Sequence, residues 1–162
     1  MRVFFAIYLL MALLGHANAQ TVQRIDVIEA GIYTSRIDKT VDAPGAVTGR
    51  KKMESDIRLV QATTNIPARR GVEFGFRYRI VGTGKTVHLK MITHVPPPGM
   101  RDPDTGNVTL TDRFYSDHTV GVPQFSAYTF DNDWEIVPGT WIFEIWLDDQ
   151  KLASQSFEIG KE

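Results

Sequence analysis

The sequence contains no cysteine, which excludes disulfide bonds, thiolate chemistry and a lipoprotein anchor. The chain has 18 basic and 19 acidic residues, so neither sign of charge is in excess. This balance does not indicate binding to nucleic acid or to an anionic membrane. There is no internal repeat, no low-complexity tract and no long apolar run after residue 14. These absences predict one domain without a membrane span, held together by a hydrophobic core alone.

The first 19 residues carry the three parts of a secretory signal peptide. Basic Arg2 precedes an apolar run over 3–14, and Ala17-Asn18-Ala19 supplies an Ala-x-Ala cleavage site. The run is shorter than the about 20 residues that a membrane-spanning helix needs. We therefore predict a signal peptide over 1–19, a mature domain over 20–162, and a bacterial periplasmic or secreted location.

Strong helical periodicity is also missing from the mature chain, and apolar residues recur instead at every second position. The alternation is cleanest over 72–81, where one face carries Val72, Phe74, Phe76, Tyr78 and Ile80. Glycine and proline punctuate the chain at intervals, as in antiparallel all-β domains. We predict further strands over 22–33, 56–64, 87–95, 108–115 and 125–130, and a polar loop over 35–52.

The stretch 134–159 predicts a final β-hairpin. A turn at Pro138-Gly139 precedes a strand whose side chains point alternately to two opposite faces, and Asp148-Asp149-Gln150 forms the next turn. Seven or eight strands suffice for a single antiparallel β-sandwich of the immunoglobulin or fibronectin type over 20–162. Its predicted core consists of Phe74, Phe76, Tyr78, Leu89, Trp141, Phe143, Ile145 and Phe157.

Several segments form a further pattern, namely Thr64-Asn65-Ile66-Pro67, Phe74-Gly75-Phe76, Tyr128-Thr129-Phe130-Asp131, the run from Pro138 to Trp146, Lys151-Leu152-Ala153 and Ser156-Phe157. Together they resemble a bacterial family known as a domain of unknown function, DUF3859. These segments span most of the mature chain. The resemblance implies a β-sandwich, and it implies no activity and no catalytic residues.

Three motifs that suggest a phosphate or metal site are better explained as turns or surface residues. Gly82-Thr83-Gly84-Lys85 lacks the earlier glycine of a phosphate-binding loop and the helix that follows one, so we predict a hairpin turn there. Asp102 and Asp104 lie in a loop with no acidic residue at the twelfth calcium position. His88 and His94 are about 20 Å apart along one strand. We predict no metal and no cofactor.

Acidic residues gather at Asp131, Asp133 and Glu135, beside Trp134. Two of them could act as the carboxylate pair of a hydrolase if they converged in one cleft. No serine stands in a Gly-x-Ser-x-Gly elbow. A solvated loop explains three acids beside a turn equally well, so we assign no catalytic residues.

Trp146 and Ile142 lie on the predicted outward face of the last hairpin. An exposed tryptophan beside an isoleucine starts an apolar patch, and such patches mark binding sites. Alternatively a loop, 35–52 or the segment around 96–106, covers Trp146; we expect such a cover.

The sequence thus favours an exported, non-enzymatic binding or accessory module that acts through this patch or through an open sheet edge. The expected partner is a protein or glycan of the cell envelope. The first alternative is a carbohydrate-binding domain in which Trp134, Tyr115 or Trp146 stacks on sugar rings. The second is a hydrolase that uses Asp131, Asp133 and Glu135.

Overall fold

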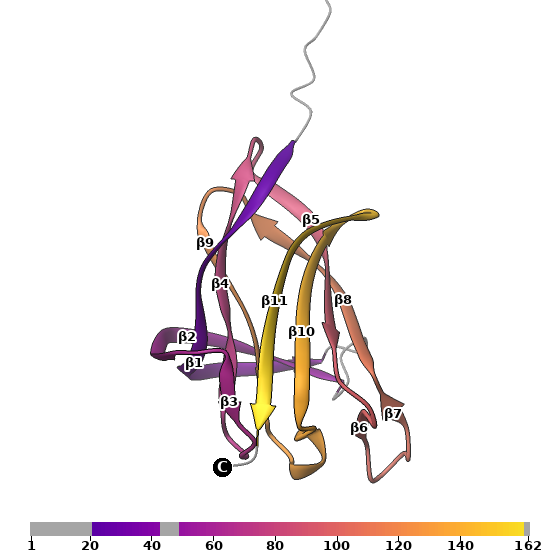
Figure 1. Cartoon of the computed structure of the whole chain (residues 1–162). Helices are drawn as coiled ribbons and strands as arrows, with labels where there is room; N and C mark the ends of the chain where they lie inside the picture. Colours follow the sequence, from indigo (N-terminus) through magenta and orange to yellow (C-terminus); the bar gives the residue numbers. More distant parts are fainter. Residues whose placement is uncertain (1–20, 43–48, 161–162) are drawn as a thin grey trace, which may run out of the picture.

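Two sheets face each other and enclose the core, as Figure 1 shows, and their strand pairs are antiparallel except for a short parallel pair at one edge. The structure is a computed structural model, and it describes residues 21–42 and 49–160 of the chain. The predicted signal peptide and the middle of the predicted loop over 35–52 lie outside these ranges. No helix in the part described is long and apolar enough to cross a bilayer.

The four-stranded sheet has the order β2-β1-β4-β9, and the five-stranded sheet has the order β3-β11-β10-β5-β8. The strands of the four-stranded sheet are β1 (Val22–Asp42), β2 (Arg50–Ala62), β4 (Glu73–Gly82) and β9 (Pro123–Thr129). Those of the five-stranded sheet are β3 (Asn65–Pro67), β5 (Thr86–His94), β8 (Thr111–Thr119), β10 (Gly139–Leu147) and β11 (Gln150–Gly160). The short pair β6 (Met100–Arg101) and β7 (Val108–Thr109) and the 3-10 turn η1 (Asp133–Glu135) complete the elements.

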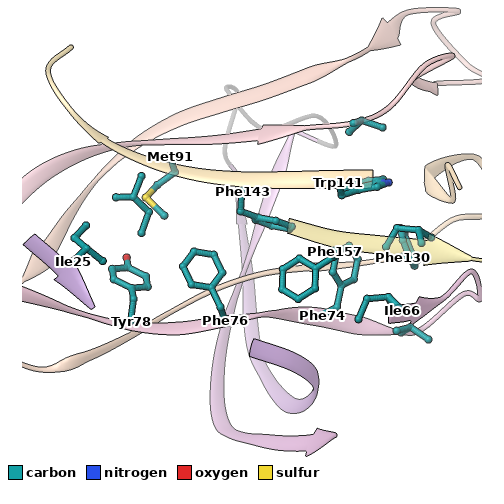
Figure 2. Close-up of a cluster of buried hydrophobic side chains, with 14 of the residues drawn as sticks. Ile25, Ile66, Phe74, Phe76, Tyr78, Met91, Phe130, Trp141, Phe143 and Phe157 are labelled. Atoms are coloured by element: carbon teal, nitrogen blue, oxygen red, sulfur yellow. The ribbon is translucent and has the colours of Figure 1, made fainter. Parts of the chain in front are cut away.

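Aromatic rings from both sheets fill the space between them (Figure 2). Phe74 of β4 lies at the centre and is fully buried, with the rings of Phe143 and Phe157 from the facing sheet 5.8 and 5.3 Å away between centroids. Edge-to-face pairs of this kind stabilise by about 0.5–1.5 kcal/mol beyond the burial of their area. All eight predicted core residues are buried, so the sequence prediction of the core is confirmed.

The predicted loop over 35–52 is wrong in the part that the structure describes. β1 continues to Asp42 and β2 begins at Arg50, and the two form one long hairpin that runs crosswise in the lower part of Figure 1. The far half of this hairpin, 34–42 with 50–58, is called the arm below. Its strands are solvated and interrupted by bulges, so they need no regular alternation of apolar residues. That is why the sequence pattern did not reveal them.

The arm bends because its register slips. Shifts occur between Ile32 and Tyr33, between Thr34 and Arg36, and between Ile37 and Lys39, and Asp56 opposite them has a left-handed φ of 52°. Extra residues on one strand bend it and increase its twist. The bend turns the arm toward the outer face of the four-stranded sheet.

The segment 82–85 is a turn, but the predicted hairpin there is wrong. β4 pairs with β1 and β9, whereas β5 pairs with β10 and β8, so the turn carries the chain from one sheet to the other. Local turn chemistry is the same in both cases, and only the pairing partners distinguish them. The final hairpin of β10 and β11 forms as predicted.

Candidate functional site

A row of four side chains crosses the outer face of the five-stranded sheet. In the register of the sheet, Trp146 of β10 lies opposite Lys151 of β11 and Lys90 of β5, and Lys90 lies opposite Tyr115 of β8. Residues opposite each other in antiparallel strands share a face, because side chains alternate along each strand. The order across the sheet is therefore Lys151, Trp146, Lys90, Tyr115, and we call it the lysine–aromatic row.

Trp146 is partly buried, and the ammonium groups of two neighbouring lysines lie over its ring. The ammonium of Lys90 lies 5.1 Å from the ring centroid, and that of Lys151 lies 5.8 Å from it. A cation within about 6 Å of an indole ring is attracted by the negative charge of its face. Lysine side chains from adjacent strands thus provide the contacts for which we expected a loop.

Glu144 fixes the orientation of this part of the row. Its Oε2 accepts a hydrogen bond of 2.8 Å from Trp146 Nε1 and lies 3.2 Å from His94 Nε2, while its Oε1 accepts one of 2.9 Å from Lys151 Nζ. Burial alone would raise the pKa of Glu144, but these donors outweigh it and lower the pKa below its ordinary value. The carboxylate therefore stays charged and holds the indole edge in place.

Two cations of this face have no acceptor among the residues described. Within the described ranges, the ammonium of Lys90 lies over the Trp146 ring and has no ion pair, and Arg113 of β8, opposite buried Ile92, has neither an ion pair nor a hydrogen bond from its side chain. Lys151, by contrast, is neutralised by Glu144. The face therefore presents, beside two aromatic rings, positive charge that no described residue neutralises, although the whole chain is close to neutral.

Tyr115 ends the row at an open edge, because β8 is the last strand of the five-stranded sheet. Its side chain is 58% exposed and stacks against His88 with an interplanar angle of 10°. His88 Nδ1 in turn lies 2.7 Å from an oxygen of Asp117. One face of the phenol ring is thus supported, and the residue remains accessible to a partner.

The other two predicted binding residues, Ile142 and Trp134, lie in different parts of the molecule. Ile142 is partly buried on the same outer face, opposite His94, and so belongs to the neighbourhood of the row. Trp134 belongs to η1 and packs against the hydrophobic core, away from Trp146. The pattern of the sequence could not show this, because Trp134 lies in a turn where no alternation applies.

The acidic cluster does not form a carboxylate pair. Glu135 is 1% exposed, and its carboxylate accepts hydrogen bonds from the backbone N–H groups of Asp131 and Asn132. Asp131 forms an ion pair of 2.6 Å with Lys52, and Asp133 is exposed. Glu135 is therefore a cap of the turn, and the structure gives no support to a hydrolase built on these acids.

A serine and a histidine do meet elsewhere, on the inward face of β8. Ser116 Oγ lies 2.7 Å from His118 Nε2, and His118 Nδ1 lies 2.9 Å from the hydroxyl of Tyr78. Burial raises the pKa of Tyr78, which keeps its hydroxyl neutral. None of the three lines either hollow described below, so the chain of contacts satisfies a buried hydroxyl and links the two sheets.

Two hollows lie on the outer side of the four-stranded sheet. One is lined by Ile57, Arg77, Pro123, Gln124 and Phe125, and the other lies where the arm meets β4 and is lined in part by Glu54 and Glu73. Within the ranges described, no group of three or more His, Asp or Glu side chains is arranged to hold a metal ion. Asp102 Oδ1 accepts backbone N–H bonds from Asp104 and Thr105, which makes a turn.

Comparison with known proteins supports the fold. The model of a family described as a domain of unknown function (DUF3859) matches residues 21–159. An immunoglobulin-like protein from Pseudomonas aeruginosa, with 24% identity, superposes with a TM-score of 0.58 over 84% of this chain and 96% of that one. An alkylpurine DNA glycosylase from Pseudomonas fluorescens reaches 14% identity and a TM-score of 0.34 over 59% of this chain and 27% of its own, too low to indicate a shared fold. Comparison with curated proteins gives no match.

Proposed function

This chain belongs to the DUF3859 family of immunoglobulin-like β-sandwiches, and from that premise we propose that it is a non-enzymatic module that binds an anionic partner. The binding surface is the outer face of the five-stranded sheet, around the lysine–aromatic row. One observation carries the proposal. Among residues 21–42 and 49–160, Lys90 and Arg113 have no acceptor for their positive charge, and they lie next to Trp146 and Tyr115.

The chemistry of the face suits carboxylate, phosphate or sulfate groups on an extended partner. Cations that already pair with internal carboxylates have little to gain from an external anion, whereas unpaired ones form charge-assisted hydrogen bonds with it. Aromatic rings beside them add contact area at a small entropic cost. Because the sequence predicts a signal peptide, we propose a partner in the cell envelope or outside the cell, for example an acidic glycan.

The test is a binding titration of the whole protein against polygalacturonate, with neutral dextran as the matched polymer. We expect binding to the acidic polymer only, weakening as salt is raised, because exposed charges are screened. Replacing both cations, Lys90→Ala with Arg113→Ala, should lower affinity about tenfold, since exposed ion pairs contribute up to about 1 kcal/mol each and 1.4 kcal/mol is a factor of ten.

The control is Arg79→Ala, which removes an exposed cation from the outer face of the other sheet. It should leave the affinity unchanged. Wild-type affinity in the double variant, or an equal loss in Arg79→Ala, would mean that the face of the five-stranded sheet does not select the partner.

Neutral carbohydrate binding is the second candidate, because the exposed Tyr115 ring is supported from one side by His88 and can stack from the other. In that case the neutral polymer binds as well, Tyr115→Ala abolishes binding, and the double cation variant retains it. The two variants therefore separate the candidates in one set of titrations.

A further inference from the structure

The arm covers the outer face of the four-stranded sheet. Tyr33 and Glu73 are paired in register and sit on the face opposite to the core residues, yet they are only 3% and 6% exposed. Residues on an outer face are buried only when something lies over them. The hollow between the arm and β4 has a volume of about 170 Å³. It is lined by Tyr33 and Glu73 and by Ser35, Lys52 and Glu54 of the arm.

Three contacts join β2 to β4 and to the turn after β9. Lys52 Nζ lies 2.6 Å from Asp131 Oδ1, and the Asp131 side chain of this pair is exposed. The Arg77 guanidinium donates to the carbonyl of Ile57. The third contact is between two carboxyl groups, Glu54 of the arm and Glu73 of β4.

The carboxyl contact lacks a hydrogen-bond donor if both groups are charged. Glu73 Oε1 is fully buried and has no partner among the residues described. Two carboxylates offer acceptors only, whereas one protonated carboxyl supplies an O–H that the other can accept. A proton on Glu54 therefore supplies a donor to the Glu73 carboxyl group and removes the repulsion between like charges at the same time.

The surroundings of Glu54 favour that proton. Burial first, and then the charge of Glu73 and a hydrogen bond to it, raise the pKa of Glu54 to about 7. Lys52 and Ser35 act in the opposite direction and are outweighed. Tyr33 has a pKa raised to about 12 by burial and by Glu29, so it stays neutral, and Asp131 is paired with Lys52.

We propose that Glu54 and Glu73 share a proton and form a pH-dependent latch that holds the arm against the four-stranded sheet. In the opened arm Glu54 has its ordinary pKa of 4.5. The latch is therefore fully formed below pH 4.5 and is lost as the pH rises through about 7. Opening uncovers Tyr33, Glu73 and the hollow, on the side of the molecule opposite to the lysine–aromatic row, and it does not depend on the proposed partner of that row.

Amide hydrogen exchange of the full-length protein tests the latch. From pH 5.5 to pH 8.5, after correction for intrinsic exchange rates, protection of the amides in 34–42 and 50–58 should fall at least tenfold, because one unit of pKa corresponds to a factor of ten. Protection of β10 and β11 should stay constant. Equal protection of the arm at both pH values would overturn the proposal.

Glu54→Gln provides the decisive variant, since its amide N–H can donate to Glu73 at every pH. Its arm should stay protected at pH 8.5. Glu73→Gln is the second variant in case the first does not fold, and it should also lose the pH dependence. Glu158→Gln, an exposed carboxylate on β11, should behave as wild type. A fall in protection in both arm variants as large as that of wild type would contradict the shared proton.

Calcium and potassium chloride, each added at pH 8.5, distinguish a proton from a metal ion. The latch predicts that neither salt restores protection of the arm. Restoration by calcium at low millimolar concentration would show that the carboxyl pair is a cation site and would overturn the assignment of a proton.

Discussion

Two glycine residues on the neighbouring strands β1 and β4 show how much depends on the absence of one carbon atom. Gly31 and Gly75 are paired, and both lie on the outer face of the four-stranded sheet. A Cβ at Gly31 would lie 2.0 Å from the carbonyl oxygen of Gln61, and one at Gly75 would lie 2.2 Å from that of Ser126. These contacts are with backbone, which cannot move aside as a flexible side chain can. The close approach of the strands at this bend therefore requires glycine.

Gly75→Ala should lower the free energy of unfolding by about 1–3 kcal/mol, the usual cost of an added methyl group in a packed site. Urea denaturation measures the effect. Gly160→Ala is the matched control, because no heavy atom lies within 4 Å of its added Cβ and its φ is not left-handed. Equal stability of Gly75→Ala and the wild type would show that the strands can separate there without loss.

Glu135 shows why the type of a residue alone does not identify a functional site. In the sequence it is one of three neighbouring acids, and in the structure its carboxylate satisfies buried N–H groups of the chain before it. Spacing could have suggested this role, because Asn132 three residues before Glu135 has the pattern of a capping box. Catalytic and capping carboxylates look identical in sequence when no geometry is available.

Among the elements, strands with one face in the core were predictable and the arm was not. Alternation in β4 and β10 identified the buried residues, since the partition between core and solvent imposes a period of two. The same alternation put Trp146 on the outer face. It could not identify Lys90 and Lys151 as neighbours of its ring, because register between distant strands depends on the pairing of the whole sheet.

The edge strand β8 is fastened to the facing sheet by the Tyr78 hydroxyl, which lies 2.9 Å from His118 Nδ1. Tyr78→Phe removes this hydrogen bond and should cost about 1 kcal/mol of stability. Thermal unfolding together with hydrogen exchange in β8 measures the effect, which should be largest in that strand. Tyr115→Phe, whose hydroxyl is exposed, serves as control. An unchanged β8 in Tyr78→Phe would mean that the hydroxyl does not hold the strand.

On the scale of the whole molecule, one aromatic core supports two outer faces with different chemistry. The five-stranded sheet presents aromatic rings and two cations that pair with no residue in the described part of the chain, and the four-stranded sheet carries the arm and its carboxyl pair. Rings from both sheets pack around Phe74 and hold these faces in place, in a chain that has no cysteine for a disulfide. The likeness to an immunoglobulin-like protein agrees with the sandwich of two sheets around this core.

We propose that recognition takes place on the outer face of the five-stranded sheet. A titration of isotope-labelled protein with short oligogalacturonate, followed by amide and lysine side-chain shifts in NMR spectra, tests this. The largest shifts should fall on Lys90, Arg113, Tyr115, Trp146 and their neighbours in β5, β8 and β10. Shifts confined to the four-stranded sheet or to the arm, or no saturable shifts at all, would contradict it.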